Sequence, residues 1–222
     1  SRDLDGIASA AILARYLEGQ GKDVKVDFVD YATQNEDLQR LRSLTETDIY
    51  IADFAFDEPE HYEVFNEIVA KGNRVAYWND HHPHKDGVDE AITRYAEITD
   101  LCGPQPYCSA EIAQQRYLPN DTVARELAEL AHDNDFWERK VENANKLADV
   151  IASGYDKNKL VSLLKHGETW NPELEQVWKA YDTRRNESYG RLDDRAEITQ
   201  YGMTSCVISL ADDMLATSDA GD

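Results

Sequence analysis

The sequence predicts an α/β fold in which a parallel sheet is flanked by helices. Over the first 140 residues, short apolar runs rich in β-branched and aromatic residues alternate with stretches of helical periodicity. The runs at 49–52 and 74–78 are almost continuously apolar, as parallel strands buried on both faces are. A length of 222 residues with 41% hydrophobic residues is enough for a core and excludes a disordered chain.

The α/β part begins with a helix, because apolar residues recur at helical spacing from Ile7 to Leu17 and Gly19 then interrupts the pattern. A strand is expected next, at 24–29, where apolar and polar residues alternate at first. The other elements expected in this part are strands at 49–52 and 74–78 and helices at 59–71, 110–117 and 123–132. Strands that alternate with helices indicate crossover connections and therefore parallel pairing.

After Phe136 the pattern changes to helices with few strands between them. Helices are expected at 144–151, 159–166 and 172–194, followed by a strand at 205–210. The last helix has an apolar stripe that includes Leu174, Trp178 and Tyr181, which favours packing over base stacking. We therefore expect three parts: an α/β domain at 1–140, a helical connector at 141–197, and the beginning of a truncated, smaller second α/β domain at 198–222.

The chain is strongly acidic, with 23 basic and 44 acidic residues and a formal net charge of −21. This charge disfavours duplex DNA, although a small anionic substrate can still bind through metal ions. A solubilising, salt-adapted surface is the alternative interpretation of the charge. No apolar run approaches the roughly 18 residues of a membrane span and no signal peptide opens the chain, so no membrane partner is expected. The 3 cysteines have no zinc-like spacing, which favours a reduced, cytoplasmic setting.

Acidic and histidine residues gather where the expected strands end or helices begin and end. They are Asp3 and Asp5 before the first helix, Asp53 after the run at 49–52, Asp80, His81 and His82 after the run at 74–78, and Asp133 and Asp135 at the end of the helix at 123–132. In an open parallel sheet the ligand crevice lies outside the carboxyl ends of the strands. We therefore expect these side chains to converge.

Most of these residues also have a structural interpretation when they are taken singly. Asp3 and Asp5 before a glycine can form a turn or a helix cap, and Asp53 can cap a strand end. The two adjacent histidines behind Asp80 are harder to explain in this way. Several carboxylates brought together repel one another and need compensation by cations. Oxygen ligands with one or two imidazoles suit manganese or magnesium better than zinc.

At these residues the sequence resembles the DHH phosphoesterase family, which is named for the triplet seen here as Asp80-His81-His82. The run Asp3-Leu4-Asp5-Gly6 matches the first motif of the family, Asp53 the second, and Asp133 the fourth. The family includes RecJ-type single-strand exonucleases, nano-RNases, cyclic-dinucleotide phosphodiesterases and exopolyphosphatases. The resemblance covers residues 1 to about 140. The histidine that the family has upstream of the first motif would precede Ser1, and most of its accessory domain would follow Asp222.

The resemblance implies two Mn²⁺ ions, with Mg²⁺ as an alternative, and a role for each motif residue. One ion would be held by Asp3 and Asp53, and the other by Asp5, Asp53, His81 and Asp133, with Asp135 as the alternative to Asp133. Asp80 would orient the imidazole of His81. His82 would donate a hydrogen bond or a proton at the scissile phosphate. Asp80 and His82 are thus the expected catalytic pair.

Two residues outside the motifs are candidates for binding the substrate. His84 could contact a phosphate, and Ser109, at the start of a helix, could offer free backbone N–H groups to one. A solvated loop and simple helix capping are the alternatives for these two positions.

The expected function is that of a metal-dependent phosphodiesterase. It would hydrolyse short single-stranded oligonucleotides or linear or cyclic dinucleotides with a water activated by two metal ions. An exopolyphosphatase or other small-molecule phosphoesterase is an alternative, and so is an inactive RecJ-like scaffold protein. The partners expected are the short single-stranded nucleic acid or dinucleotide substrate and a second copy of the chain in a homodimer.

Overall fold

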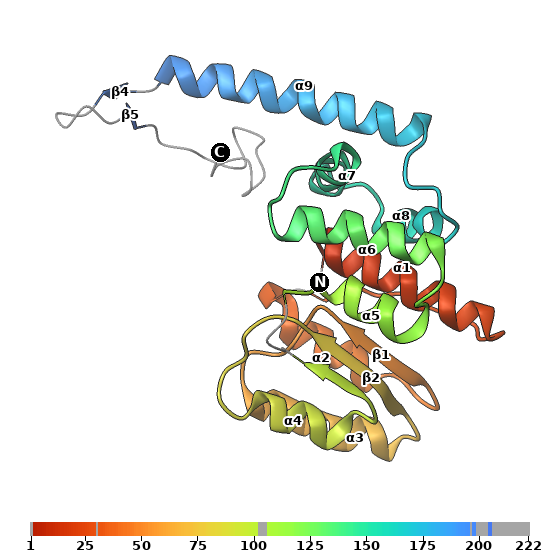
Figure 1. Cartoon of the computed structure of the whole chain (residues 1–222). Helices are drawn as coiled ribbons and strands as arrows, with labels where there is room; N and C mark the ends of the chain where they lie inside the picture. The colour runs from red at the N-terminus through yellow and green to blue at the C-terminus, as the bar shows by residue number, and fades with distance from the viewer. Residues whose placement is uncertain (1, 30, 102–105, 196, 199–203, 206–222) are drawn as a thin grey trace. The chain divides into compact units, whose positions relative to one another are not determined.

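The computed structural model describes residues 2–29, 31–101, 106–195, 197–198 and 204–205, and it shows an α/β chain (Figure 1). The described part is mainly helical and contains a small three-stranded parallel sheet. The chain divides into two compact units, residues 1–145 with 156–169 and residues 146–155 with 170–222. The first unit contains the sheet and all the predicted site residues.

The sheet of the first unit consists of β1 (Asp48–Ala52), β2 (Arg74–Asp80) and β3 (Thr99–Leu101), in the order β1-β2-β3. Both strand pairs are parallel, and near their ends Ala52 pairs with Asn79 and Asp80 pairs with Leu101. The carboxyl ends of all three strands therefore meet at one edge. The strands expected at 49–52 and 74–78 are confirmed as β1 and β2, and β3 was not expected. The expected burial holds for β2, whereas in β1 only Ile49 is buried, because β1 lies at the edge of the described sheet.

Helices cover both faces of this sheet. Those of the first unit are α1 (Leu4–Gly19), α2 (Gln34–Arg42), α3 (Val64–Ala70), α4 (Val88–Tyr95), α5 (Ser109–Tyr117), α6 (Thr122–Asp135) and α8 (Lys157–Leu164), with short 3-10 helices at Tyr31–Thr33 and Pro59–Glu63. Figure 1 shows α3 and α4 against one face of the sheet and α1 and α5 against the other. α1 also packs on α6 and α8. The arrangement is therefore three layers, helix, sheet and helix.

The second unit holds the later helices. α7 (Glu142–Ala152) begins in the first unit and ends in the second, which also contains α9 (Pro172–Arg195) and a two-stranded antiparallel ladder of β4 (Glu197–Ile198) and β5 (Thr204–Ser205). The strand expected at 205–210 lies outside the described residues apart from Ser205. α8, which we expected to belong to a connector at 141–197, belongs to the first unit. No helix of the described residues is long and apolar enough to cross a membrane.

The expected strand at 24–29 is wrong. The segment Lys22–Val29 belongs to no strand or helix, and β1 is therefore an edge of the described sheet. This segment, α1, α2 and β1 line a cavity of about 820 Å³. The segment lacks a ladder partner, and its alternation leaves Val24 and Val26 only half-buried. An alternating pattern is not enough for a strand when no neighbouring strand offers backbone hydrogen bonds.

An aromatic core fixes the backbone that follows β1. Phe54, Phe56, Tyr62, Phe65 and Trp78 are buried together between the sheet, α3 and the preceding 3-10 helix. The Trp78 indole donates to the Phe54 carbonyl at 2.8 Å. The Tyr62 hydroxyl accepts from the Phe56 N–H at 2.9 Å and donates to the Phe56 carbonyl at 3.3 Å. These bonds hold the chain just after β1, where Asp53 lies.

Replacing Tyr62 with Phe should lower the free energy of unfolding by about 1–3 kcal/mol, because the buried N–H and carbonyl of Phe56 lose their side-chain partner. Urea denaturation measures this loss. Tyr117→Phe is the control, since no hydrogen bond to its hydroxyl is found in the described part of the chain. Equal stability of Tyr62→Phe and wild type would show that these two bonds do not hold the loop.

Candidate metal and phosphate site

Three carboxylates from distant parts of the chain surround one nitrogen of His81. Its Nε2 atom lies 3.6 Å from Asp5 Oδ2, 3.5 Å from Asp53 Oδ1 and 3.7 Å from Asp135 Oδ2. The neighbouring His82 places Nδ1 at 3.8 Å from Asp53 Oδ1. We call these five residues the Asp–His cluster. Sequence positions as distant as 5 and 135 therefore meet at the carboxyl edge of the sheet.

The parallel register of β1 and β2 brings two members of the cluster together. Asp53 directly follows β1 and His81 directly follows β2. The Asp53 N–H donates to the backbone carbonyl of Asn79 at 3.0 Å, and the Asn79 side chain donates to the Ser109 carbonyl at 3.0 Å. Asn79 thus ties the end of β1 to the start of α5. Asp53 has φ of 57°, a left-handed conformation that aspartate tolerates better than most residues.

Asp5 lies in the first turn of α1 and is anchored by a second helix. Its Oδ2 accepts from the Ser109 N–H at 2.8 Å and its Oδ1 from the Ala110 N–H at 2.7 Å, both at the N-terminus of α5. Burial and the nearby charge of Asp53 nevertheless raise the pKa of Asp5 well above its ordinary value. Each carboxylate oxygen has a further lone pair, so Asp5 can still ligate a cation.

The pKa values of the other two carboxylates of the cluster shift in opposite directions, although burial raises both. Burial alone would raise the pKa of Asp53, but the adjacent His81 imidazole holds it below its ordinary value. Burial raises the pKa of Asp135, His81 opposes this, and the charges of Asp53 and Asp3 raise it further. The carboxyl groups of the cluster therefore raise one another's pKa, and the imidazoles of His81 and His82 oppose this only in part.

Asp80 holds His82 and His84 rather than His81. Asp80 is fully buried, with Oδ1 at 2.8 Å from His82 Nδ1 and Oδ2 at 3.2 Å from His84 Nε2. Burial would raise the pKa of Asp80, but the hydrogen bonds from His82 and His84 hold it well below its usual range. The same bond to Asp80 raises the pKa of His82 to about 9. His82 is therefore a cation and a hydrogen-bond donor at neutral pH.

The structure brings Asp135, and not Asp133, next to His81. Asp133 is buried, and its Oδ1 accepts from the Lys140 N–H at 2.8 Å. Its role in this geometry is to hold the chain that leaves α6. Residues two positions apart on a helix do not face the same side, so only one of the two acids could point toward His81.

The remaining predicted site residues have other partners. Asp3 is the N-cap of α1, where its Oδ1 accepts from the Gly6 N–H at 3.0 Å. Both ring nitrogens of His84 are held, one by Asp80 and the other by Asp89. Ser109 is the first residue of α5 rather than its cap, and its N–H is taken by Asp5. The ring nitrogens of His84 and the N–H of Ser109 are therefore already taken, and the Ser109 hydroxyl, which has no hydrogen-bond partner among the described residues, is buried.

The donor atoms of the cluster fit a hard divalent cation. Asp53, His81 and His82 place ligand atoms within 4.8 Å of one another, and so do Asp5, His81 and Asp135. Carboxylate oxygens outnumber imidazole nitrogens, and no thiol takes part. This donor set suits Mn²⁺ or Mg²⁺, which prefer oxygen ligands.

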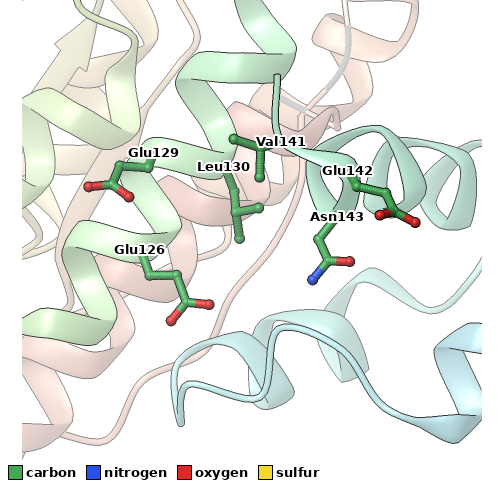
Figure 2. A pocket seen from close by; sticks show the side chains of 6 residues that line it. All are labelled: Glu126, Glu129, Leu130, Val141, Glu142 and Asn143. Carbon is green, nitrogen blue, oxygen red and sulfur yellow. The ribbon is translucent and has the colours of Figure 1, made fainter. Parts of the chain in front are cut away.

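A cavity of about 280 Å³ elsewhere in the first unit contains none of the predicted site residues (Figure 2). It is lined by Glu126, Glu129, Leu130, Val141, Glu142 and Asn143. Figure 2 shows acidic and apolar side chains around it, with no histidine or basic group among them. The Asp–His cluster therefore remains the candidate site.

The sequence interpretation missed two residues of this site or left them open. Asn79 was not identified, and only its position between a buried strand and the triplet could have suggested it. Asp135 was left as an alternative to Asp133, because the sequence does not fix the rotation of α6. No family model, no curated protein and no solved structure matches the chain, so the site is argued from its own geometry.

Replacing His82 with Gln should destabilise the metal-free protein at pH 6 and have little effect above about pH 9. The folded pKa of about 9 lies above the ordinary value of 6.5, so the ion pair contributes fully below about pH 6.5 and is lost as the pH rises through 9. Because the His82 side chain is 44% exposed, the loss at pH 6 should be about 1 kcal/mol.

Urea denaturation in a chelating buffer across this pH range measures the effect. His166→Gln, which changes an exposed histidine, is the control and should behave like wild type at each pH. A loss for His82→Gln that is the same at pH 6 and pH 10 would contradict the ion pair with Asp80.

Proposed function

We propose that the chain is a metal-dependent phosphodiesterase that hydrolyses short single-stranded oligonucleotides or linear or cyclic dinucleotides. The observation that carries this proposal is the position of His81 Nε2 among Asp5, Asp53 and Asp135. Buried carboxylates gathered at one point repel one another, which costs stability unless a cation compensates them. A purely structural protein would gain nothing from this arrangement.

The residues of the cluster have distinct roles in the proposed reaction. Asp5, Asp53, His81 and Asp135 would hold divalent ions, with His81 common to the two groupings of ligand atoms. When bound, such ions supply positive charge for phosphoryl oxygens and lower the pKa of water. His82, cationic at neutral pH and 44% exposed, can donate a hydrogen bond to a phosphoryl oxygen or a proton to the leaving oxygen.

Asp80 supports this role of His82 through its hydrogen bond to the far ring nitrogen, Nδ1. By accepting from Nδ1 it fixes the ring and leaves Nε2 as the atom that can donate to the substrate. Its hydrogen bond to His84 fixes the other side of the same carboxylate. Asp80 therefore acts as a positioning residue for His82, in place of the role toward His81 that the family resemblance implies.

Two further observations support the substrate class. The first is a resemblance to the motifs of DHH phosphoesterases, which are matched by residues 3–5, by Asp53 and by the triplet Asp80-His81-His82. This resemblance indicates phosphoester hydrolysis. The net charge of −21 disfavours long polyanions, whose binding depends on a cationic surface. A short substrate that binds mainly through metal ions is less sensitive to this repulsion.

Asp53→Asn should lower Mn²⁺-dependent hydrolysis of a diribonucleotide by about two orders of magnitude or more, because it removes the buried charge next to both histidines. Asparagine tolerates the left-handed backbone at this position, so the fold should be retained. Asp86→Asn, at an exposed position outside the cluster, is the control and should hydrolyse at the wild-type rate. Activity of Asp53→Asn within tenfold of wild type would contradict the proposal.

Asp135→Asn should weaken Mn²⁺ binding about tenfold or more in titration calorimetry, because it removes a charged ligand. Asp133→Asn is the matched control on the same helix. Its amide oxygen can still accept from the Lys140 N–H, so Mn²⁺ affinity should stay close to wild type. The opposite ranking of the two variants would show that Asp133 is the ligand.

A further inference from the structure

A loop of exposed aromatic and charged side chains follows Asp135 directly, in which Lys140 pairs with Glu138 at 2.8 Å. It comprises residues Phe136–Lys140, which we call the aromatic loop. Phe136 is 38% exposed and Trp137 is 58% exposed. The Arg139 guanidinium lies over the Trp137 ring, 4.8 Å from its centroid. Large aromatic side chains are normally buried, so two adjacent exposed ones mark this loop as a contact surface.

The aromatic loop has a defined conformation because Asp133 anchors it. The Asp133 carboxylate accepts from the Lys140 N–H at 2.8 Å, and the Asp133 carbonyl accepts from the Glu138 N–H at 3.0 Å. The Trp137 N–H donates to the Asn134 carbonyl at 3.3 Å. A loop that is already ordered loses little conformational freedom when it binds a ligand.

The backbone of the loop is strained without any gain in packing. Trp137 has φ of 53° and Arg139 has φ of 54°, values that bulky residues rarely adopt. Only four non-glycine residues in the described ranges have positive φ. Two of them are Trp137 and Arg139, and another is Asp53 of the cluster. Strain of this kind persists where a functional arrangement requires it. Burial does not explain it here, since the Trp137 side chain is exposed.

The aromatic loop is continuous with the Asp–His cluster. The Phe136 ring contacts the His81 ring edge-on, with centroids 6.3 Å apart, and the His132 ring at 4.7 Å. Asp135, a member of the cluster, immediately precedes Phe136. A phosphate bound at the cluster would therefore have the groups attached to it next to the loop.

We propose that the aromatic loop binds the base of a nucleotide whose phosphate lies at the Asp–His cluster. This inference rests on the proposed function and names the part of the substrate that the loop recognises. The Trp137 side chain, which is 58% exposed with the Arg139 guanidinium over its ring, offers a stacking surface that accepts any base. Arg139 also adds a positive charge to the loop in an acidic chain. The loop would thus favour nucleotides over polyphosphate, which has no aromatic group.

The test compares adenosine monophosphate with ribose 5-phosphate, which has the same sugar and phosphate but no base, by calorimetry in the presence of Mn²⁺. Wild type should bind the nucleotide about fivefold or more tightly than the sugar phosphate. Trp137→Ala should remove this preference and leave the affinity for ribose 5-phosphate unchanged. Trp137→Phe should keep most of it, because a phenyl ring still stacks. Val69→Ala, at an exposed apolar position on α3, is the control.

Equal affinity of wild type for the two ligands would overturn the proposal that Trp137 stacks on the base. The same conclusion would follow if Trp137→Ala kept the wild-type preference. Hydrolysis of a diribonucleotide by wild type and Asp53→Asn tests the phosphodiesterase separately. Base preference without hydrolysis would support the loop and reject the proposed reaction. Hydrolysis that depends on Asp53, combined with no base preference, would support the reaction and reject the loop.

Discussion

Three carboxylates surround one imidazole nitrogen at the carboxyl edge of the sheet, and their mutual repulsion is the constraint that the rest of the first unit satisfies. The parallel register of β1 and β2 brings Asp53 next to His81. Two N–H groups at the start of α5 hold the carboxylate of Asp5. The three carboxylates come from different elements, so the packing of the first unit brings them together in spite of their repulsion. A divalent cation is the simplest source of compensation.

Next to the carboxylates of the cluster, the negative charge of Asp80 is already compensated by the histidines His82 and His84. Asp80 is buried with a histidine on each oxygen, so its negative charge is matched within the protein. This pairing leaves His82 cationic, and its side chain is partly exposed beside Asp53. The triplet thus separates two tasks. In the proposed reaction, His81 would help to hold the cation among the carboxylates, and His82, which is 44% exposed, would donate a proton or hydrogen bond to the substrate.

Much of this arrangement could be predicted from the sequence, because buried parallel strands leave a clear signal. The apolar run at 74–78 predicted β2, and the order of strands and acids predicted that Asp5, Asp53 and His81 would meet. The expected strand at 24–29 was wrong, since alternation does not show whether a neighbouring strand is present. The helix α2 was missed because it has only two leucines among polar and charged residues.

The side-chain partners within the site were less predictable. The choice between Asp133 and Asp135 depends on the rotation of α6 about its axis, which packing against α1 and α5 determines. The bonds of Asp80 to His82 and His84 depend on the turn that follows β2. The aromatic loop could be recognised as exposed only once the fold was known. From the sequence alone, Phe136 and Trp137 are as typical of a buried core as of a surface.

Diffraction from crystals soaked in Mn²⁺, with anomalous scattering to locate the ions, tests the central claim most directly. A Mn²⁺ ion held by the cluster should give an anomalous peak at about 2.0–2.6 Å from ligand atoms of Asp53 and His81, since a bound ion must lie within coordination distance of both. A peak among the glutamates of the cavity in Figure 2 and none at the cluster would contradict the proposed metal site. So would the absence of any peak within coordination distance of His81 in crystals soaked at saturating Mn²⁺.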